Sequence, residues 1–226
     1  MDLTKEQKKQ LLNKLLGFIS DHKNQLFDEI IQYRTRYLTV VLEDIYQPQN
    51  ASAVLRTADC FGIQDVHIIE NRNEYIINPE VALGASKWLT LHRYNESENN
   101  TLKAIQKLKA EGYRIVATLP HTDDIMLSDL DMDKKTALFF GTELKGLSKV
   151  VQEQADVFVK IPMYGFTESY NISVSAALCL QELSNKMRTE DIDWKLSESE
   201  ILDVKLDWAR AVVKEADNVE KTLFSK

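Results

Sequence analysis

The chain has 226 residues, of which 44% are hydrophobic, and this length can bury one full core with terminal additions. No run of about 18 apolar residues occurs and the start of the chain is charged and polar, so we expect neither a membrane span nor a secretory signal and predict a cytoplasmic protein. The formal net charge of −7 argues against a general binder of polyanions, but it leaves room for a local basic patch.

The two ends of the chain are predicted to be helical extensions. Residues 1–37 carry leucine and isoleucine at helical spacing, interrupted near residues 17–22, which predicts two helices. This segment also has a basic balance, since it holds seven Lys or Arg against five acidic residues. Residues 188–226 are polar and acidic, and their apolar residues fit one or two amphipathic helices.

Strands and helices are predicted to alternate between these extensions, over residues 38–187. Apolar runs predict strands at 38–42, 66–70, 88–92, 113–119, 137–140 and 157–161. Helical patterns lie between Pro48 and Gly62, at 102–109, at 148–155 and from 172 on, whereas 71–87 is weakly patterned, with a turn expected at 84–86. The alternation predicts an α/β fold with a mostly parallel sheet covered by helices on both faces.

The signatures of several common α/β sites are missing from the sequence. The seven glycines form neither the Gly-x-Gly-x-x-Gly turn of dinucleotide-binding proteins nor a phosphate-binding P-loop, and no Gly-x-Ser-x-Gly nucleophile turn occurs. The histidines stand singly, without a partner at the spacing of metal ligands. We therefore expect no metal, and ordinary surface or loop positions for His22, His67, His92 and His121.

Three loops remain, each at the carboxyl end of a predicted strand, where open α/β sheets bind their ligands. The first carries the pattern Asn-x-x-Ala-x-x-Arg-Thr-Ala with Asn50 and Arg56, and the second reads Gly-x-Glu-x-x-Gly at 141–146. The third covers 161–173 and reads Ile-Pro-Met-Tyr-Gly, then Ser-Tyr-Asn-Ile-Ser. Its small polar residues offer short-range hydrogen bonds, so this loop either holds a ligand or braces the helix that follows.

In this order and spacing, the three motifs resemble the TrmH (SpoU) branch of the SPOUT superfamily, which are RNA 2'-O-ribose methyltransferases, over about residues 38–187. The resemblance implies a C-terminal deep trefoil knot that includes the 162–171 loop, and S-adenosylmethionine as cofactor. It also implies a homodimer, which the small apolar face of the 172–183 helix and an amphipathic N-terminal arm in need of a partner support. The cofactor's adenine would be held by backbone groups near Leu119, Gly141, Ile161, Ser169, Tyr170, Asn171 and Ser173.

The resemblance also implies the catalytic groups, which are Arg56, Asn50, Glu143, Ser169 and Asn171. A guanidinium stays protonated in proteins, so we expect Arg56 to clamp a phosphate and stabilise charge on the ribose oxygen rather than to act as a base. Asn50 would shape the loop that places Arg56, and Glu143 would orient Asn50 or a substrate group. The alternatives are a surface arginine on a helix, turn chemistry at Asn50, and helix capping by Ser169 and Asn171.

The RNA that the resemblance implies is tRNA. Ribosomal-RNA members often carry a separate N-terminal RNA-binding domain, whereas this chain has only a helical arm. Its Gly-Ala-Ser-Lys-Trp-Leu stretch at 84–89 looks like that of the tRNA (guanosine-2'-O)-methyltransferases, which act on a D-loop guanosine. A related enzyme acting on ribosomal RNA and a catalytically silent RNA-binding factor are the alternatives. The basic residues expected to contact RNA are Lys8, Lys9, Arg34, Arg36 and Arg56.

Overall fold

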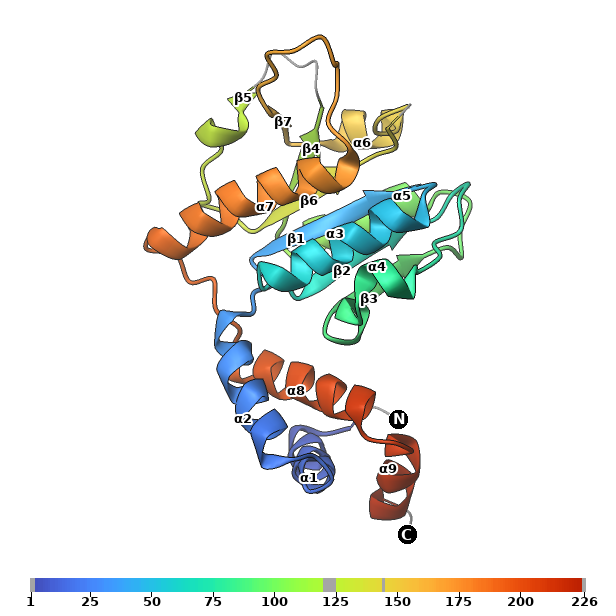
Figure 1. Cartoon of the computed structure of the whole chain (residues 1–226), viewed down its shortest axis with the longest axis vertical. Helices are drawn as coiled ribbons and strands as arrows, with labels where there is room; N and C mark the ends of the chain where they lie inside the picture. Colours follow the sequence, from blue (N-terminus) through green and yellow to red (C-terminus); the bar gives the residue numbers. More distant parts are fainter. Residues whose placement is uncertain (1–2, 120–124, 144, 225–226) are drawn as a thin grey trace. The chain divides into compact units, whose positions relative to one another are not determined.

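The computed structural model describes residues 3–119, 125–143 and 145–224. These residues form two compact units, a helical unit made of residues up to 34 and from 195 on, and an α/β unit made of residues 35–194 (Figure 1). Within this described part of the chain, no helix is both long and apolar enough to cross a membrane.

The helical unit joins the two ends of the chain. Its elements are α1 (Lys5–Leu16), α2 (Asp21–Ile30), the 3-10 turn η1 (Ile31–Tyr33), α8 (Glu198–Val212) and α9 (Ala216–Phe224). Capping boxes at Thr4 and Ser197 start α1 and α8. α1 packs against α8 and α9, and Phe27 meets the Trp208 ring edge-on at 5.3 Å. The two predicted N-terminal helices are confirmed, and the buried leucines of α1 are covered within this unit, whereas Phe18, Leu26 and Ile30 stay exposed.

One parallel sheet forms the centre of the α/β unit. Its strands are β1 (Leu38–Glu43), β2 (Asp65–Ile69), β3 (Thr90–Tyr94), β4 (Arg114–Thr118), β5 (Ile125–Met126), β6 (Thr136–Phe140) and β7 (Val157–Lys160). They lie in the order β3-β2-β1-β6-β4-β7-β5, and every neighbouring pair is parallel. The predicted α/β class with a parallel sheet is confirmed, because the apolar runs are the strands buried in this sheet.

Helices cover both faces of the sheet. They are α3 (Pro48–Cys60), α5 (Asn100–Ala110), α6 (Lys149–Gln154) and α7 (Ile172–Thr189). α3 and α7 pack side by side on one face (Figure 1), while α5 and α6 lie on the other. Side chains alternate along β1 accordingly, with Val40 and Leu42 in the core under α3 and α7, and Val41 in the core under α5 and α6.

The shortest elements were not predicted from the sequence. They are α4 (Pro79–Ala82), η2 (Ala85–Lys87), β5 and the 3-10 turn η3 (Leu127–Asp129). Such short segments contain too few residues to show a period. The turn expected at 84–86 consists of Gly84 in a left-handed conformation, with φ of 80°, followed by η2.

Two histidines depart from the expected surface or loop positions. His67 on β2 is 1% exposed, and its ring stacks on His92 of β3 with 4.5 Å between the ring centroids. The two residues are paired in the parallel ladder, a relation that their spacing along the chain does not show. The prediction is therefore wrong for His67 and His92, whereas His22 is exposed and His121 lies outside the described residues.

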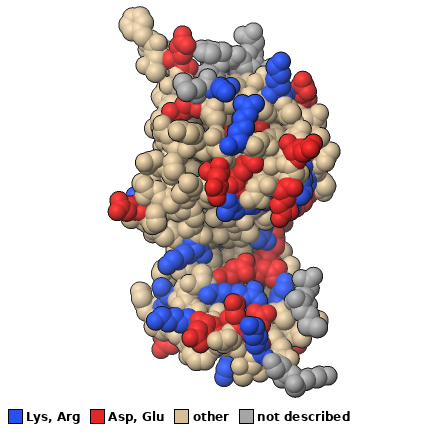
Figure 2. Space-filling view, turned by 90° about the vertical axis from the view of Figure 1, so that its right-hand side faces the viewer, with Lys and Arg blue, Asp and Glu red and all other residues tan. Residues whose placement is uncertain are grey.

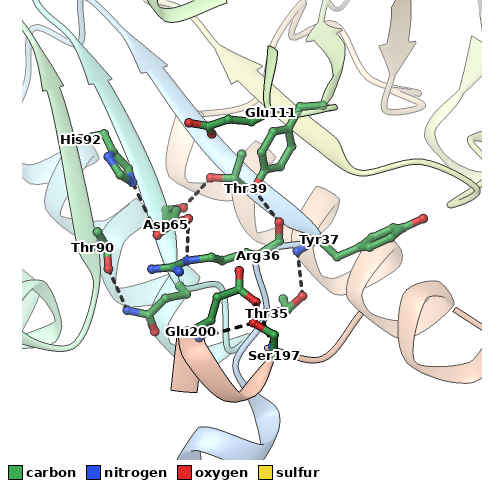
Figure 3. A network of polar contacts seen from close by, with 12 residues as sticks. Thr35, Arg36, Tyr37, Thr39, Asp65, Thr90, His92, Glu111, Ser197 and Glu200 are labelled. Atoms are coloured by element: carbon green, nitrogen blue, oxygen red, sulfur yellow. Dashed lines mark hydrogen bonds and ion pairs between the residues drawn. The ribbon is translucent and has the colours of Figure 1, made fainter. Parts of the chain in front are cut away.

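His92 belongs to a network of polar contacts that also includes Arg36 and Asp65 (Figure 3). Asp65, at the start of β2, lies 3.0 Å from Arg36 Nε and 3.5 Å from His92 Nε2. His67 Nδ1 lies 2.9 Å from the hydroxyl oxygen of Tyr94. Burial, reinforced by the neighbouring His92, lowers the pKa of His67 to about 3. Arg36, Asp65 and His92 thus face one another within the protein, with Arg36 and Asp65 at the amino ends of β1 and β2.

Candidate active site

The three motif loops meet at one edge of the sheet, because they follow the carboxyl ends of the parallel strands β1, β6 and β7. Each loop contributes one side chain to a hydrogen-bonded cluster. Asn50 Nδ2 donates to Glu143 Oε1 at 2.9 Å, and Asn171 Nδ2 donates to the same oxygen at 2.8 Å. Asn171 Nδ2 also lies 3.0 Å from its acceptor Asn50 Oδ1. Asn50 and Asn171, which are 93 and 28 positions away from Glu143 in the sequence, thus bind the same carboxylate oxygen.

Both amides are fixed by the helices that follow their loops. Asn50 is 9% exposed in the first turn of α3. Asn171 is the N-cap of α7, and its Oδ1 accepts hydrogen bonds from the Ser173 backbone N–H at 2.8 Å and from the Ser173 hydroxyl at 2.6 Å. Helix capping and membership of the cluster therefore coexist at Asn171. Among the described residues, Glu143 Oε2 has no hydrogen-bond partner, so this oxygen is open to a ligand.

The turn that carries Glu143 depends on its glycines. Thr142 and Gly146 form an antiparallel bridge with N···O distances of 3.1 and 2.8 Å, which folds the turn back on itself. A Cβ atom at Gly141 would lie 2.2 Å from the Gly146 carbonyl oxygen. Gly146 has a φ of 64°, in the left-handed region that favours glycine. The glycine spacing of the second motif thus follows from the geometry of this turn; Leu144 lies outside the described residues.

A cavity of about 420 Å³ lies against this turn. The volume is within the range of roughly 300–1,000 Å³ typical of small-molecule sites. Residues expected at the cofactor that line it are Leu119, Gly141, Ile161, Ser169 and Tyr170. Asn171 and Ser173 do not line it and contact each other instead. Its wall also includes residues that we had not assigned to the cofactor, among them Thr118, Phe140, Met163 and Cys179.

A larger groove of about 1210 Å³ shares the same turn. It is lined by residues that follow β1, β2 and β6, including Asn50. Glu143 and both glycines of the turn line the groove as well as the smaller cavity. Glu143 therefore lies where the two spaces adjoin. Two reactants, one bound in the cavity and one in the groove, would lie next to each other at this residue.

Arg56 is not brought into this cluster. It is exposed on α3 and lines neither the cavity nor the groove. Its side chain makes no hydrogen bond or ion pair with any described residue. Within one chain, the geometry accounts for Asn50, Glu143 and Asn171 together but leaves Arg56 apart from them.

The two arginines expected to contact RNA at the end of the arm are engaged elsewhere. Arg34 is 3% exposed, and its guanidinium lies over the Trp208 ring at 5.3 Å from the centroid. Arg36 forms the ion pair with Asp65. A buried guanidinium cannot reach a phosphate on the surface, so the structure argues against Arg34 as an RNA contact.

The lysines of α1 differ in availability. Lys8 lies 2.7 Å from Asp203 in an ion pair, whereas Lys5 and Lys9 are exposed and four residues apart, on one face of the helix. On the face that Figure 2 shows, Lys and Arg are interspersed with Asp and Glu rather than gathered into one large basic patch. Any phosphate contact by this arm would therefore come from a few side chains.

The polar wall of the groove was not predicted from the sequence. This wall includes Asp44, Arg72 and Lys145. The acidic pair at the end of the first predicted strand was a signal for it, because polar residues at the carboxyl end of a parallel strand face the ligand-binding edge. Arg72 lies in the weakly patterned stretch 71–87, where no motif drew attention to it.

The chain is similar to several known proteins. A model of the SpoU rRNA Methylase family matches residues 37–181. The chain is 46% identical over 211 residues to the tRNA (guanosine(18)-2'-O)-methyltransferase of Borreliella burgdorferi, which covers 93% of this chain and 95% of that protein. Its identity to the protein of the same name from Thermus thermophilus is 32%, over 72% of this chain and 82% of that one. The crystal structure of the A. aeolicus TrmH/SpoU tRNA modifying enzyme matches with a TM-score of 0.77 at 27% identity, over 86% of this chain and 98% of that one.

Proposed function

The chain belongs to the SpoU rRNA Methylase family, and we propose that it transfers a methyl group from S-adenosylmethionine to the 2'-hydroxyl of a ribose in tRNA, at a D-loop guanosine. The observation that carries this proposal is the Glu143 carboxylate, held by two amides where a cavity of cofactor size adjoins a larger groove. Support for tRNA comes from the relatives at 46% and 32% identity, whose names specify guanosine 18 of tRNA.

The smaller cavity fits the adenosine part of the proposed cofactor. Its wall combines apolar residues such as Leu119 and Ile161 with Gly141 and the polar residue Ser169. Such a wall can bind a flat apolar ring and read its hydrogen-bonding edge without a charged side chain. When bound, the cofactor supplies a methyl group on a positively charged sulfur.

In this proposal, Glu143 orients the acceptor ribose. Asn50 and Asn171 occupy Oε1, so Oε2 can accept a hydrogen bond from a ribose hydroxyl. Because the two amides fix the carboxylate before the substrate arrives, little reorganisation is needed when the hydroxyl oxygen attacks. Ser173 supports the arrangement through Asn171.

Arg56 is proposed to clamp a phosphate beside the target ribose and to stabilise the charge that develops on the 2'-oxygen. Since Arg56 lines neither space in its own chain, this role calls for a site completed by a second protomer, and we propose a homodimer. Apolar side chains that a partner would cover are exposed in the 164–178 segment: Tyr164, Phe166, Tyr170, Val174 and Leu178. A monomeric mass in light scattering, with activity retained, would exclude the dimer.

Three further features belong to the same proposal. The 162–171 loop is part of a deep trefoil knot, which an experimental backbone trace through β7 and α7 would test. Residues 38–187 form the methyltransferase domain, with helical extensions at 1–37 and 188–226. The protein acts in the cytoplasm, where fractionation should recover it together with its tRNA substrate.

The test is methyl transfer from labelled S-adenosylmethionine to tRNA and to ribosomal RNA, followed by mapping of the modified nucleotide. We expect label in tRNA at one D-loop guanosine, and no label when that nucleotide carries a 2'-deoxyribose. Because the family is named for ribosomal RNA, label in ribosomal RNA alone would establish the second candidate. Cofactor binding without transfer to either RNA would favour a silent RNA-binding factor.

A further inference from the structure

The groove beside the cofactor cavity is large enough for more than one nucleotide. Its volume of about 1210 Å³ exceeds the roughly 300–1,000 Å³ typical of a site for a single small molecule. It begins at Glu143 and extends past the carboxyl ends of β1 and β2 to the start of α5. A ribose bound at Glu143 would therefore leave room along this wall for a neighbouring nucleotide.

One segment of the wall is held by a single carboxylate. Asp44 has a φ of 54°, an uncommon left-handed conformation for a residue other than glycine. Its Oδ1 accepts hydrogen bonds from the backbone N–H groups of Asn71 and Arg72 at 2.7 and 2.8 Å, and of Asn73 at 3.5 Å. Asn73 Nδ2 in turn donates to the Asp44 carbonyl oxygen at 2.7 Å. The loop after β2 is thus fixed to the end of β1.

The same segment is also tied to the helices on the far side of the groove. Asn71 Nδ2 donates to Thr101 Oγ1 at 2.8 Å, and the Thr101 hydroxyl donates to Glu43 Oε1 at 2.6 Å. Glu43 is 3% exposed and also accepts from the Ser148 hydroxyl and backbone N–H at 2.7 and 2.8 Å. These contacts link β1, the loop after β2, α5 and the start of α6 into one rigid wall.

Cationic side chains are exposed on this wall. Arg72, Lys145 and Lys149 line the groove, and none of their side chains makes a hydrogen bond or ion pair with a described residue. The carboxylates of Glu43 and Asp44 are engaged by the hydrogen bonds above, and Glu98 at the start of α5 is exposed. Arg72 differs from the two lysines because its backbone N–H donates to a carboxylate, that of Asp44, and because its guanidinium can bind a phosphate in bidentate fashion.

We propose that this groove receives the RNA strand next to the target ribose, and that Arg72, held in place by Asp44, binds a backbone phosphate of that strand. The inference rests on the proposed function and adds to it a positioning residue for the acceptor RNA. Phosphate contacts set the register of a protein on a nucleic acid without reading its sequence. Arg72 therefore places the neighbouring nucleotide so that the target 2'-hydroxyl reaches Glu143.

The first test is Arg72→Gln, with Lys134→Gln as the matched control. Lys134 is an exposed lysine two residues before β6, at the opposite edge of the sheet. We expect Arg72→Gln to raise the KM for tRNA about tenfold, as for a lost charge-assisted hydrogen bond, and to reduce the slope of log affinity against log salt by about 0.7–0.9. The affinity for S-adenosylmethionine should not change. A KM and salt slope equal to those of Lys134→Gln would overturn the inference.

The second test separates positioning from charge. Asp44→Gly accommodates the left-handed backbone but removes the anchor of the Arg72 loop. If only charge mattered, removal of the Asp44 carboxylate beside the RNA should strengthen tRNA binding. If Asp44 acts by holding the Arg72 loop, its removal should weaken tRNA binding. We expect a KM for tRNA raised several-fold, and little further loss when Arg72→Gln is added. Tighter binding of tRNA by Asp44→Gly would overturn the positioning role.

The outcome is distinguishable from failure of the proposed function. Wild-type protein that transfers no methyl group to any RNA would refute the proposed function. Equilibrium binding of tRNA to wild type, Arg72→Gln and Lys134→Gln, measured without turnover, still tests the phosphate contact, because it does not depend on methyl transfer.

Discussion

The two edges of the parallel sheet hold polar clusters of different kinds. At the amino edge, Asp65 lies between Arg36 and His92, so these polar groups face one another within the protein (Figure 3). At the carboxyl edge, Glu143 has one oxygen held by amides and one open, and Arg72 has a fixed backbone but a side chain without a partner among the described residues. Polar groups that serve the fold face other protein groups, whereas those proposed to act on a substrate are held on one side and open on the other.

The largest loss of activity is expected from substitution of Arg56, whose side chain has no partner among the described residues at either edge. Arg56→Ala should lower the turnover of tRNA methylation a hundredfold or more, because it removes stabilisation of charge in the transition state. Arg56→Lys, which keeps the charge but loses the planar fork, should lie between wild type and Arg56→Ala. Calorimetry should show unchanged affinity for S-adenosylmethionine in both variants.

A pH profile of the rate distinguishes the two roles considered for this residue. An arginine acting as a base would give an inflection that Arg56→Lys displaces, while a clamp gives no displaced inflection. Turnover of Arg56→Ala at the wild-type rate would show that Arg56 is an ordinary surface residue.

Gly141→Ala is expected to move the turn at the carboxyl edge. The new Cβ would collide with the Gly146 carbonyl oxygen, 2.2 Å away, so the turn carrying Glu143 must shift. A displacement of about 1 Å at a reaction centre can cost on the order of a hundredfold in rate, and we expect kcat/KM to fall by about this factor. Gly17→Ala is the control, because its Cβ would meet nothing closer than 3.4 Å. Equal kcat/KM values for the two variants would show that the geometry of the turn is unimportant.

At the amino edge, we expect a change of pH to alter the free energy of unfolding rather than substrate binding. The folded protein keeps His67 neutral, with a pKa of about 3 against an ordinary 6.5, so the unfolded chain binds the proton first. The stability that depends on neutral His67 is thus complete above pH 6.5 and is lost progressively as the pH falls toward 3. Between pH 7.5 and 5 this amounts to about 2 kcal/mol in the free energy of unfolding.

Urea unfolding at these two pH values measures the effect of His67. In His67→Gln the loss of stability between them should be smaller by about the same 2 kcal/mol, whatever the absolute stability of the variant. The exposed His22→Gln serves as control and should retain the wild-type pH dependence. A pH dependence unchanged by His67→Gln would show that the buried ring does not govern acid stability.

The smallest effect is expected in the helical unit, where basic side chains are few and partly paired. Changing Lys5 and Lys9 to Gln should flatten the salt dependence of tRNA binding by up to about two units of slope, if each contacts one phosphate. Lys8→Gln is the matched control, because Lys8 is already paired with Asp203. If the double variant and the control have the same slope, RNA contacts lie elsewhere on the protein.

The sequence predicted the central sheet well because its strands are apolar runs of ordinary length, ending at glycines and polar loops. It also predicted the three motif loops at one edge, since parallel strands bring their carboxyl ends together. Contacts between distant residues could not be read from spacing, however. The stacking of His67 on His92, the burial of Arg34 against Trp208 and the anchoring of the Arg72 loop all depend on pairings that only the folded chain creates.

We propose that the Glu143 carboxylate, fixed by Asn50 and Asn171, orients the acceptor ribose. The most direct test is the single-turnover rate of methyl transfer by Glu143→Gln at saturating S-adenosylmethionine and tRNA. Glutamine preserves an oxygen for the two amides but removes the charge and replaces the open oxygen by a donor. We predict a rate at least about tenfold below wild type, with unchanged cofactor affinity, because a positioned acceptor is lost from the reacting hydroxyl. A rate equal to that of wild type would contradict the account.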